Sequence, residues 1–501
     1  MFIYFFVSIA MLIICGLDIC HVIDLSKKRL FIFYLLLVPH MPLYWFHLIN
    51  THVINATGIM PYICTVVFGI STFIFQIYTT FRLHLQMLRR DRTDNLRINI
   101  IYAGRNLARC GLWGLYLLAL WYLLFFVVFP FNPYQELMDT TFAIFPGISN
   151  VTKTYAVLFM EIVYAIIFVW LFLFNGCLRI FFGSRNLVIG KRVAILLFIW
   201  VPIVQLFLVR IMCEAARDEY LVTKSRESQD TFTKTDDTCM TKYPIIMVHG
   251  IGFRDLRYYN YWGRIPEILM QHGATIYYGH QNAWGTIENN ADDISRVIDK
   301  ALAENGCDKV NIIAHSKGGL DCRYLISSLG YGDRVASLTT INTPHRGSEM
   351  ITLLNKLPDY IYRYISKQLN KPSMLVGDKK PDCYNSSKQL DPKYCEEFNR
   401  NNPDVEGVYY QSYTSVMKNA FSDSLLSIPY LLMRFEKAKE NDGLVELSSA
   451  KWGEFRGVLR PTNKRGISHG DMIDLKREDI RGFDVLKFFY DVVCELKEKG
   501  M

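Results

Sequence analysis

One serine of the chain stands where a nucleophile could work. Ser316 lies within VNIIAHSKGGL, residues 310–320, after a strand-forming run and before two glycines. A serine hydroxyl attacks well only when a base takes its proton, and it must also be exposed. A sharp strand-to-helix turn provides this exposure, and Gly318 and Gly319 permit the tight entry into the helix. The pattern predicts a nucleophile elbow, with Ala314 in the place of the usual first glycine.

A nucleophilic serine needs a base and an acid further along the chain. Only His345 and His469 follow Ser316. The order serine, acid, histidine that goes with this kind of elbow favours His469. Asp442, in the turn NDGLV, is predicted to orient the imidazole and to stabilise its charged form. The competing acids are Asp423 and Glu446.

The oxyanion that forms during attack on a carbonyl needs two backbone N–H donors. One is expected from Lys317, directly after the serine. The other is expected from the turn after the first core strand, where residues 244–253 are PIIMVHGIGF. Ile251 is the predicted donor there, and His249 is expected to shape the loop.

The elements that must position these residues are a sheet and its covering helices. From residue 243 onward, short β-branched runs alternate with helix-like segments such as 288–304. That alternation is typical of a mostly parallel sheet flanked by helices. We therefore expect an α/β domain over residues 243–501. The polar, charged stretch 214–242 is interpreted as a linker or a juxtamembrane helix.

The residues before 214 have a different character. The chain is 51% hydrophobic and 14% aromatic, and its apolar excess lies in this part. A helix needs about 20 apolar residues to cross a bilayer. Stretches of that length lie at 2–20, 30–49, 59–81, 111–131, 154–176 and 193–213. We expect an all-α, multi-pass transmembrane domain over residues 1–213. The alternatives are buried core helices and, for the first stretch, a cleaved signal peptide.

The loops between these stretches differ in charge. The first, third and fifth carry several Lys and Arg residues, whereas the second has none and the fourth has only Lys153. The positive-inside rule places the basic loops in the cytosol. Six spans then put the second half of the chain on the lumenal or extracellular side. Sequons at Asn55, Asn150 and Asn385 all fall on that predicted side.

Residues 243–475 resemble the secreted bacterial triacylglycerol lipases of the α/β-hydrolase superfamily. The resemblance rests on PIIMVHGIG, NYWGRIPEIL, KVNIIAHSKGGLDCRYL, TTINTPHRGSE, NDGLV and SHGD, in the order that the family has. It implies the α/β-hydrolase fold, with Ser316, Asp442 and His469 as nucleophile, acid and base. It also implies a structural calcium ion on Asp471, with Asp423 as the best candidate for the second carboxylate.

A long insertion, roughly residues 350–420, separates TPHRG from the acid. Lipases need a cover over the acyl pocket, because an open pocket would be an exposed apolar patch. The amphipathic segment LLNKLPDYIYRYI leads us to predict that residues 350–366 help to cover the site. A surface helix without that role is the alternative.

These features predict a membrane-anchored serine ester hydrolase that cleaves lipid acyl esters through an acyl-enzyme intermediate. A phospholipase, lipid-anchor deacylase or acyltransferase with the same triad is one alternative. A membrane scaffold or transporter with an inactive hydrolase-like module is another. The net charge of +8 is spread between apolar runs, so we expect no nucleic-acid partner. The chemistry requires no cofactor.

Overall fold

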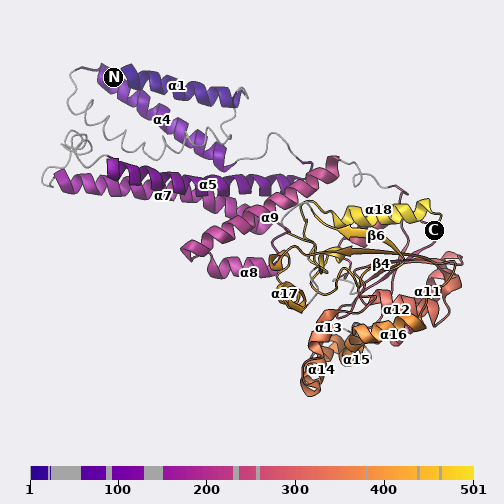
Figure 1. Cartoon of the computed structure of the whole chain (residues 1–501). Helices are drawn as coiled ribbons and strands as arrows, with labels where there is room; N and C mark the ends of the chain where they lie inside the picture. The colour runs from indigo at the N-terminus through magenta and orange to yellow at the C-terminus, as the bar shows by residue number, and fades with distance from the viewer. Residues whose placement is uncertain are drawn as a thin grey trace. The chain divides into compact units, whose positions relative to one another are not determined.

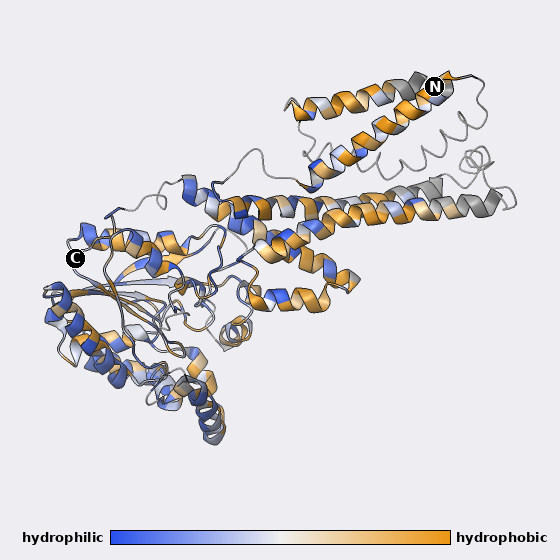
Figure 2. Cartoon of the chain, turned by 180° about the vertical axis from the view of Figure 1, so that it is seen from behind, coloured by the Kyte–Doolittle hydropathy of each residue, from blue (hydrophilic) through white to orange (hydrophobic). Residues whose placement is uncertain are grey.

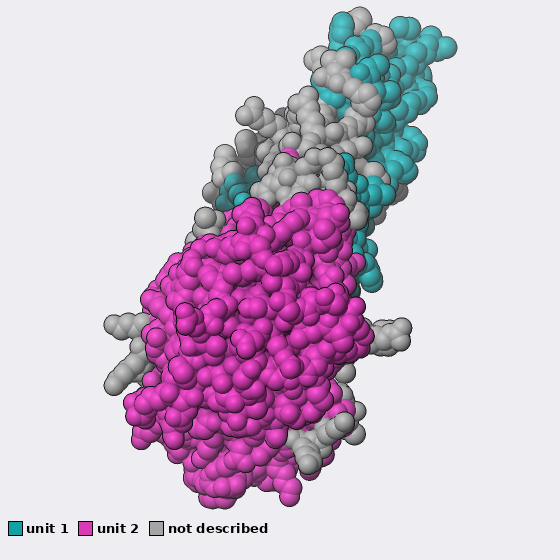
Figure 3. All heavy atoms as spheres, turned by 90° about the vertical axis from the view of Figure 1, so that its right-hand side faces the viewer, with its two compact units in different colours: residues 1–223 teal, residues 224–501 magenta. Residues whose placement is uncertain are grey.

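The computed structural model divides into two compact units, residues 1–223 and 224–501 (Figure 3). The residues that the structure describes are 2–20, 23, 58–85, 93–128, 150–228, 236–254, 260–375, 377–378, 381–436, 440–461 and 465–501. The boundary falls inside helix α9 (Pro202–Ser228). Residues 214–228 of the predicted linker are therefore helical.

The first unit is built from helices. They are α1 (Phe2–Ile19), α4 (Met60–His84), α5 (Leu96–Val128), α7 (Asn150–Gly183), α8 (Ile189–Phe198) and the start of α9 (Figure 1). Two glycines let α5 and α7 approach closely. A Cβ on Gly111 would lie 2.7 Å from the Leu173 nitrogen, and one on Gly176 would lie 2.4 Å from the Ala108 nitrogen. Small residues of this kind are common where membrane helices pack.

Two described helices are long and apolar enough to cross a bilayer. They are Tyr62–Arg82, with 21 residues, and Phe159–Gly183, with 25. A shorter apolar helix spans Ser8–Ile19. Hydrophobic residues predominate along these segments (Figure 2). The finding for the described residues is thus two candidate spans, which overlap the predicted stretches 59–81 and 154–176.

One of the other predicted spans differs from the structure. The stretch 193–213 was expected to form one span, but α8 ends at Phe198 and α9 begins at Pro202. Proline lacks an N–H and fixes φ, so it suits the first turn of a new helix better than the interior of an existing one. The stretch 111–131 falls largely in the longer helix α5. The stretch 30–49 lies outside the described residues.

The second unit is built on a six-stranded parallel sheet, in the order β2-β1-β3-β4-β5-β6. The strands are β1 (Ile245–Val248), β2 (Ile276–Tyr278), β3 (Val310–His315), β4 (Val335–Ile341), β5 (Tyr409–Ser415) and β6 (Glu454–Leu459). Every residue of β1, β3 and β4 is buried, as in parallel sheets covered on both faces. The predicted α/β fold is confirmed.

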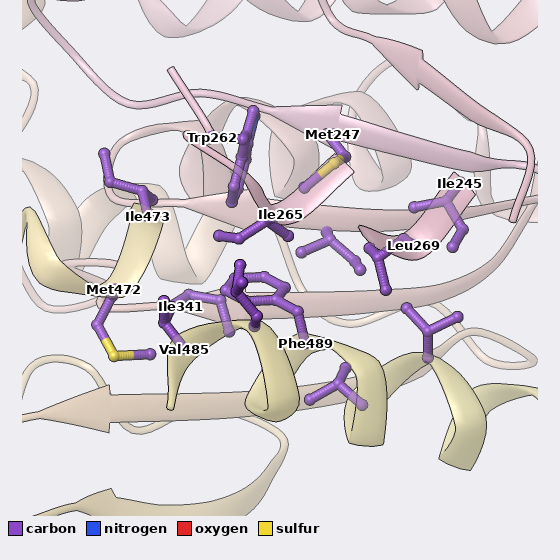
Figure 4. Close-up of a cluster of buried hydrophobic side chains, with 14 of the residues drawn as sticks. Ile245, Met247, Trp262, Ile265, Leu269, Ile341, Met472, Ile473, Val485 and Phe489 are labelled. Carbon is purple, nitrogen blue, oxygen red and sulfur yellow. The ribbon is translucent and has the colours of Figure 1, made fainter. Parts of the chain in front are cut away.

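Helices seal both faces of this sheet. They are α10 (Ile265–Gln271), α11 (Ile287–Asn305), α12 (Gly318–Ser327) and α18 (Val485–Glu498). Ile245 and Met247 belong to a cluster with Trp262, α10 and α18 (Figure 4). Ile246 and Val248 belong to a second cluster with α11 and α12. Successive strand side chains point to opposite faces of the sheet, so residues of the same strand pack into both clusters.

Two insertions extend the fold. Between β4 and β5 lie α13 (Glu349–Leu354), α14 (Asp359–Leu375), α15 (Cys383–Lys388) and α16 (Pro392–Asn401); between β5 and β6 lie η3 (Ala420–Ser422) and α17 (Ser427–Glu436). The first insertion is the one predicted at 350–420. Ile351 of α13 joins a buried cluster against which Ile251 packs. The insertion therefore lies beside the loop that follows β1. The remaining short helices are η2 (Gly332–Arg334) and η4 (Asp471–Ile473).

Candidate active site

Ser316 lies at a sharp turn between β3 and α12, where the elbow was predicted. Its φ is +55°, a left-handed conformation that costs a residue other than glycine about 1 kcal/mol. The Ser316 N–H donates to the Ile341 carbonyl at 2.9 Å, and its own carbonyl accepts from the Gly319 N–H at 3.1 Å. Backbone hydrogen bonds on both sides therefore hold the strained turn.

The glycines around the serine are required by close backbone approach. A Cβ on Gly250 would lie 2.7 Å from the Cβ of Ser316, and one on Gly318 would lie 2.5 Å from the His249 carbonyl oxygen. A Cβ on Gly319 would lie 2.3 Å from Oγ1 of Thr343. All three distances are shorter than real Cβ contacts. The elbow is thus packed against the loop after β1.

His469 and Asp442 lie together, as predicted. Nδ1 of His469 is 2.7 Å from Oδ2 of Asp442, and the His469 N–H donates to the Asp442 carbonyl at 2.9 Å. The second carboxylate oxygen, Oδ1, accepts from the N–H groups of Leu444 and Val445 at 2.9 and 2.8 Å. Two backbone N–H groups thus bond to the Asp442 carboxylate, which is fixed in one orientation beside His469.

The structure places His469 beside the elbow. Its ring centroid lies 4.4 Å from that of His315, the residue before Ser316. The described contacts of Ser316 include no hydrogen bond to His469. Such bonds are often long in unliganded enzymes and tighten when substrate binds. The His469–Asp442 pair thus lies next to the turn that carries Ser316.

The competing residues are bound to other partners. Oε1 of Glu446 accepts from the Glu349 N–H at 2.7 Å, and burial raises the pKa of Glu446 to about 7. Asp423 is ion-paired with Lys476 at 2.5 Å. His345 lies 3.1 Å from Oγ1 of Thr340. None of these contacts brings a second acid or base to the elbow.

The two predicted oxyanion donors are available. In the part of the chain that the structure describes, neither the Ile251 N–H nor the Lys317 N–H donates a hydrogen bond. The neighbouring Gly252 N–H is used, since it donates to the Ala283 carbonyl at 2.9 Å. The ring nitrogens of His249 contact the carbonyl oxygens of Gly250 and Gln281 at 2.8 and 3.0 Å. His249 therefore shapes this loop, as expected.

The sequence did not reveal a hydrogen-bonded link from the loop to the elbow. The Tyr261 hydroxyl accepts from the Gly250 N–H at 3.0 Å and lies 2.7 Å from Nδ1 of His315. Burial lowers the pKa of His315 well below its ordinary value. A neutral His315 that is unprotonated at Nδ1 accepts a hydrogen bond from the Tyr261 hydroxyl, which completes the link. The sequence signal was the resemblance of NYWGRIPEIL to the lipases, which gave Tyr261 no role.

A buried ion pair at the elbow was also missed. Nζ of Lys317 lies 2.6 Å from Oδ1 of Asp321, and each side chain is 1% exposed. Asp321 also accepts from Nδ2 of Asn290 at 2.9 Å. The i,i+4 spacing of lysine and aspartate was the available signal. The pair keeps the first turn of α12 neutral beside the nucleophile.

The residues predicted to hold calcium do not fit the ion. Asp423 and Asp471 come together at the turn of His469, but Lys476 pairs with the first and Arg465 with the second. Calcium takes six to eight oxygen ligands. Among the described residues, no group of three or more His, Cys, Asp or Glu side chains is arranged to hold a metal ion.

Comparisons with known proteins agree with this fold. The alpha/beta hydrolase fold family matches residues 243–433. Triacylglycerol lipase 2 of Saccharomyces cerevisiae is 31% identical over 259 residues, which cover 48% of this chain and 74% of that enzyme. The triacylglycerol lipase of Vibrio cholerae is 37% identical over 115 residues, which cover 23% of this chain and 36% of that enzyme.

Among solved structures, this chain is similar to the lipase BlEst2 of Bacillus licheniformis in its mature form. Its sequence identity is 16% and its TM-score 0.38, over 50% of this chain and 92% of the lipase. The relative in Saccharomyces cerevisiae, matched over most of its length, carries the assignment. The chain therefore belongs to the triacylglycerol lipase family of the α/β-hydrolases and is a carboxylester hydrolase.

Proposed function

We propose that this hydrolase cleaves the acyl esters of lipids with Ser316, His469 and Asp442. The observation that carries the proposal is the 2.7 Å contact between His469 Nδ1 and Asp442 Oδ2, next to the strained elbow. A carboxylate in that position keeps the proton on Nδ1. Nε2 is then left unprotonated and acts as the base for the serine hydroxyl.

The reaction proceeds in two acyl transfers. Oγ of Ser316 attacks the acyl carbonyl while Nε2 of His469 takes its proton, and the N–H groups of Ile251 and Lys317 stabilise the oxyanion. His469 then gives the proton to the leaving alcohol, and an ester on Ser316 remains. Water, deprotonated by His469, attacks that ester; His469 then returns the proton to Oγ of Ser316 as the acyl–oxygen bond breaks and the fatty acid is released. Asp442 stabilises the imidazolium at each stage. These steps require no cofactor.

The first unit anchors the enzyme in a membrane in this proposal. Besides the two candidate spans, large apolar side chains are exposed along its helices, among them Phe73, Phe159, Phe182 and Phe207. Exposed apolar surface on this scale is costly in water and is covered by a bilayer. The six-span topology and the lumenal or extracellular side of the catalytic domain belong to the proposal. An anchored lipase stays next to its lipid substrate.

The helical insertions supply a cover for the acyl site in this proposal. The predicted lid at 350–366 corresponds to α13 and the start of α14, where Tyr360 and Tyr364 are exposed. The part between β5 and β6 is still more apolar at its surface. There Phe421 and Phe435 are 95% and 85% exposed. We assign a share of the cover to α17 as well.

The test is hydrolysis by the full-length chain in detergent micelles, with triacylglycerols, phospholipids, acyl thioesters and short-chain esters as parallel substrates. We expect release of fatty acid from triacylglycerol, abolished by Ser316→Ala and retained by Ser327→Ala at the end of α12. Faster hydrolysis of one of the other substrates would change the proposed substrate class. A folded protein inactive on every arm would overturn the proposal and favour an inactive module.

The side of the membrane is tested separately. Asn385 is exposed and begins a sequon, so it can be glycosylated if it faces the lumen. We expect a glycan that is lost in Asn385→Gln and is protected from added endoglycosidase in sealed vesicles. Digestion of residues around Asn385 by protease added outside sealed, cytosol-side-out vesicles would contradict the orientation.

A further inference from the structure

A charged cluster lies under the turn that carries His469. Nζ of Lys476 is 2.5 Å from Oδ1 of Asp423, and Nη2 of Arg465 is 2.8 Å from Oδ1 of Asp471. Arg465 also lies 3.5 Å from the carboxylate of Glu478. The three carboxylates are at most 9% exposed. Buried charges are stable only when they are paired and hydrogen-bonded. The pairing of every charge in this cluster therefore contributes to the stability of the fold.

Ser468 connects the cluster to the histidine beside it. Its hydroxyl donates to Oδ2 of Asp423 at 2.7 Å, and its N–H donates to Oδ2 of Asp471 at 2.8 Å. All four oxygens of the two aspartates therefore have a partner. Because Ser468 directly precedes His469, both aspartates fix the backbone that presents the imidazole.

A divalent cation has no place among these groups. A calcium ion would need the carboxylate oxygens that Lys476, Arg465 and Ser468 already use, at about 2.3–2.6 Å. The Lys476 ammonium would also repel it from within the first coordination shell. The resemblance to the bacterial lipases predicted calcium from the two aspartates alone, and this prediction took no account of the basic residues that face them.

We propose that Lys476 and Arg465 replace a bound divalent cation in this chain and hold the His469 turn without metal. They act as positioning residues, since they bond to the aspartates and not to a substrate. The inference rests on the proposed role of His469 only for its consequence in catalysis. The structural claim is independent: the turn is stable in the absence of calcium, and it loses that independence when the lysine charge is removed.

The experiment measures thermal unfolding of the full-length chain in micelles, in a chelator and in millimolar calcium. We expect the wild-type Tm to differ by less than about 1 °C between the two, since a ligand that does not bind the folded state cannot stabilise it. Equilibrium dialysis with radioactive calcium should show no stoichiometric binding. A Tm that falls in chelator, or one calcium ion bound per chain, would overturn the inference.

Variants sharpen the test. Lys476→Gln leaves Asp423 buried without its cation and should lower Tm in chelator by about 10 °C, which calcium partly restores. Lys476→Arg keeps the charge and should remain insensitive to calcium. Lys487→Gln is the matched control, since it removes an exposed lysine 2.8 Å from Asp491, and should behave as wild type. A Lys476→Gln Tm equal to wild type in chelator would contradict the inference.

The wild-type arm keeps the test valid if Lys476→Gln fails to fold. The readout also separates the two proposals. A protein that binds no calcium and keeps its Tm, yet hydrolyses no ester, would overturn the proposed function and leave the cation replacement standing. An active enzyme that needs calcium for stability would overturn the cation replacement and leave the proposed function standing.

Discussion

The nucleophile elbow and the His469 turn are held in place by different interactions. Ser316 is fixed by backbone: a buried strand, main-chain hydrogen bonds, and glycines such as Gly318 that admit close contact. The His469 turn is fixed by side-chain charges, namely the Asp442 carboxylate and the pairs around Asp471. Apart from its buried ion pair, the elbow should respond chiefly to added volume, whereas the turn should respond chiefly to altered charge.

The largest effect is expected at the turn. Asp442→Asn keeps the volume but removes the charge that orients His469, and it should lower the rate of ester hydrolysis by about 10⁴-fold. Tm should change little, because the amide oxygen still accepts from Leu444 and Val445. Initial rates with a saturating ester measure this, with the exposed Asp333→Asn as control. A loss under tenfold would mean that another acid serves the histidine.

A large loss of stability is expected where the elbow does contain charge. Lys317→Met leaves the Asp321 carboxylate buried without its partner, and should cost about 3–5 kcal/mol of the free energy of unfolding. The double variant Lys317→Met, Asp321→Asn should recover most of that loss. Denaturant unfolding of the catalytic unit in the full chain gives both numbers. Equal stability of the single variant and wild type would show that the pair is not needed, and the elbow would then depend on sterics alone.

The stability of the fold is expected to depend on pH through Glu446, which lies next to the turn that carries Asp442. Its pKa in the folded protein is about 7, above the ordinary value of about 4.3, so the folded state binds the proton more tightly. The contribution to stability is complete below about pH 4.3 and is lost as pH rises through about 7, by roughly 4 kcal/mol in total.

Glu446→Gln isolates this contribution. The variant keeps an oxygen for the Glu349 N–H and has no proton to lose. The stability of wild type minus that of the variant should therefore fall by roughly 3 kcal/mol between about pH 4.5 and pH 8. Unfolding curves at several pH values measure the difference. A difference independent of pH would show that the pKa of Glu446 is the same in the folded and unfolded states.

A smaller effect is expected from added side-chain volume, and it should differ between the elbow and the His469 turn. Gly318→Ala puts a methyl group 2.5 Å from the His249 carbonyl, whereas Gly470→Ala, beside His469, meets only the Leu475 side chain at 3.3 Å. We expect a loss of about 1–3 kcal/mol for the first and under about 1 kcal/mol for the second. Equal losses, measured by the same denaturant method, would mean that backbone sterics hold both regions alike.

This difference explains what could be predicted from sequence. The strand VNIIA and the glycines that follow Ser316 act locally, so the elbow and the parallel sheet were predicted correctly. Among Asp442, Glu446 and Asp423 the sequence could only prefer one. The choice depends on which carboxylate finds backbone donors and which finds a cation, and those partners come from distant segments.

The same reasoning accounts for the features in which the structure differs from the sequence predictions. The Tyr261 bond to His315 joins residues 54 positions apart, and no local pattern marks it. The break before Pro202 inside the predicted span 193–213 was visible as a proline, but the apolar run outweighed it in the prediction. The calcium site was implied by two aspartates, and their pairing with Lys476 appears only in three dimensions.

The most direct test of the account is where a fluorophosphonate labels the folded full-length chain, since this probe reacts with an activated serine. The account predicts a single adduct on the peptide that contains Ser316, absent in Ser316→Ala and formed about 10³–10⁴-fold more slowly in Asp442→Asn. A folded protein that stays unlabelled, or one labelled on a different serine, would contradict it.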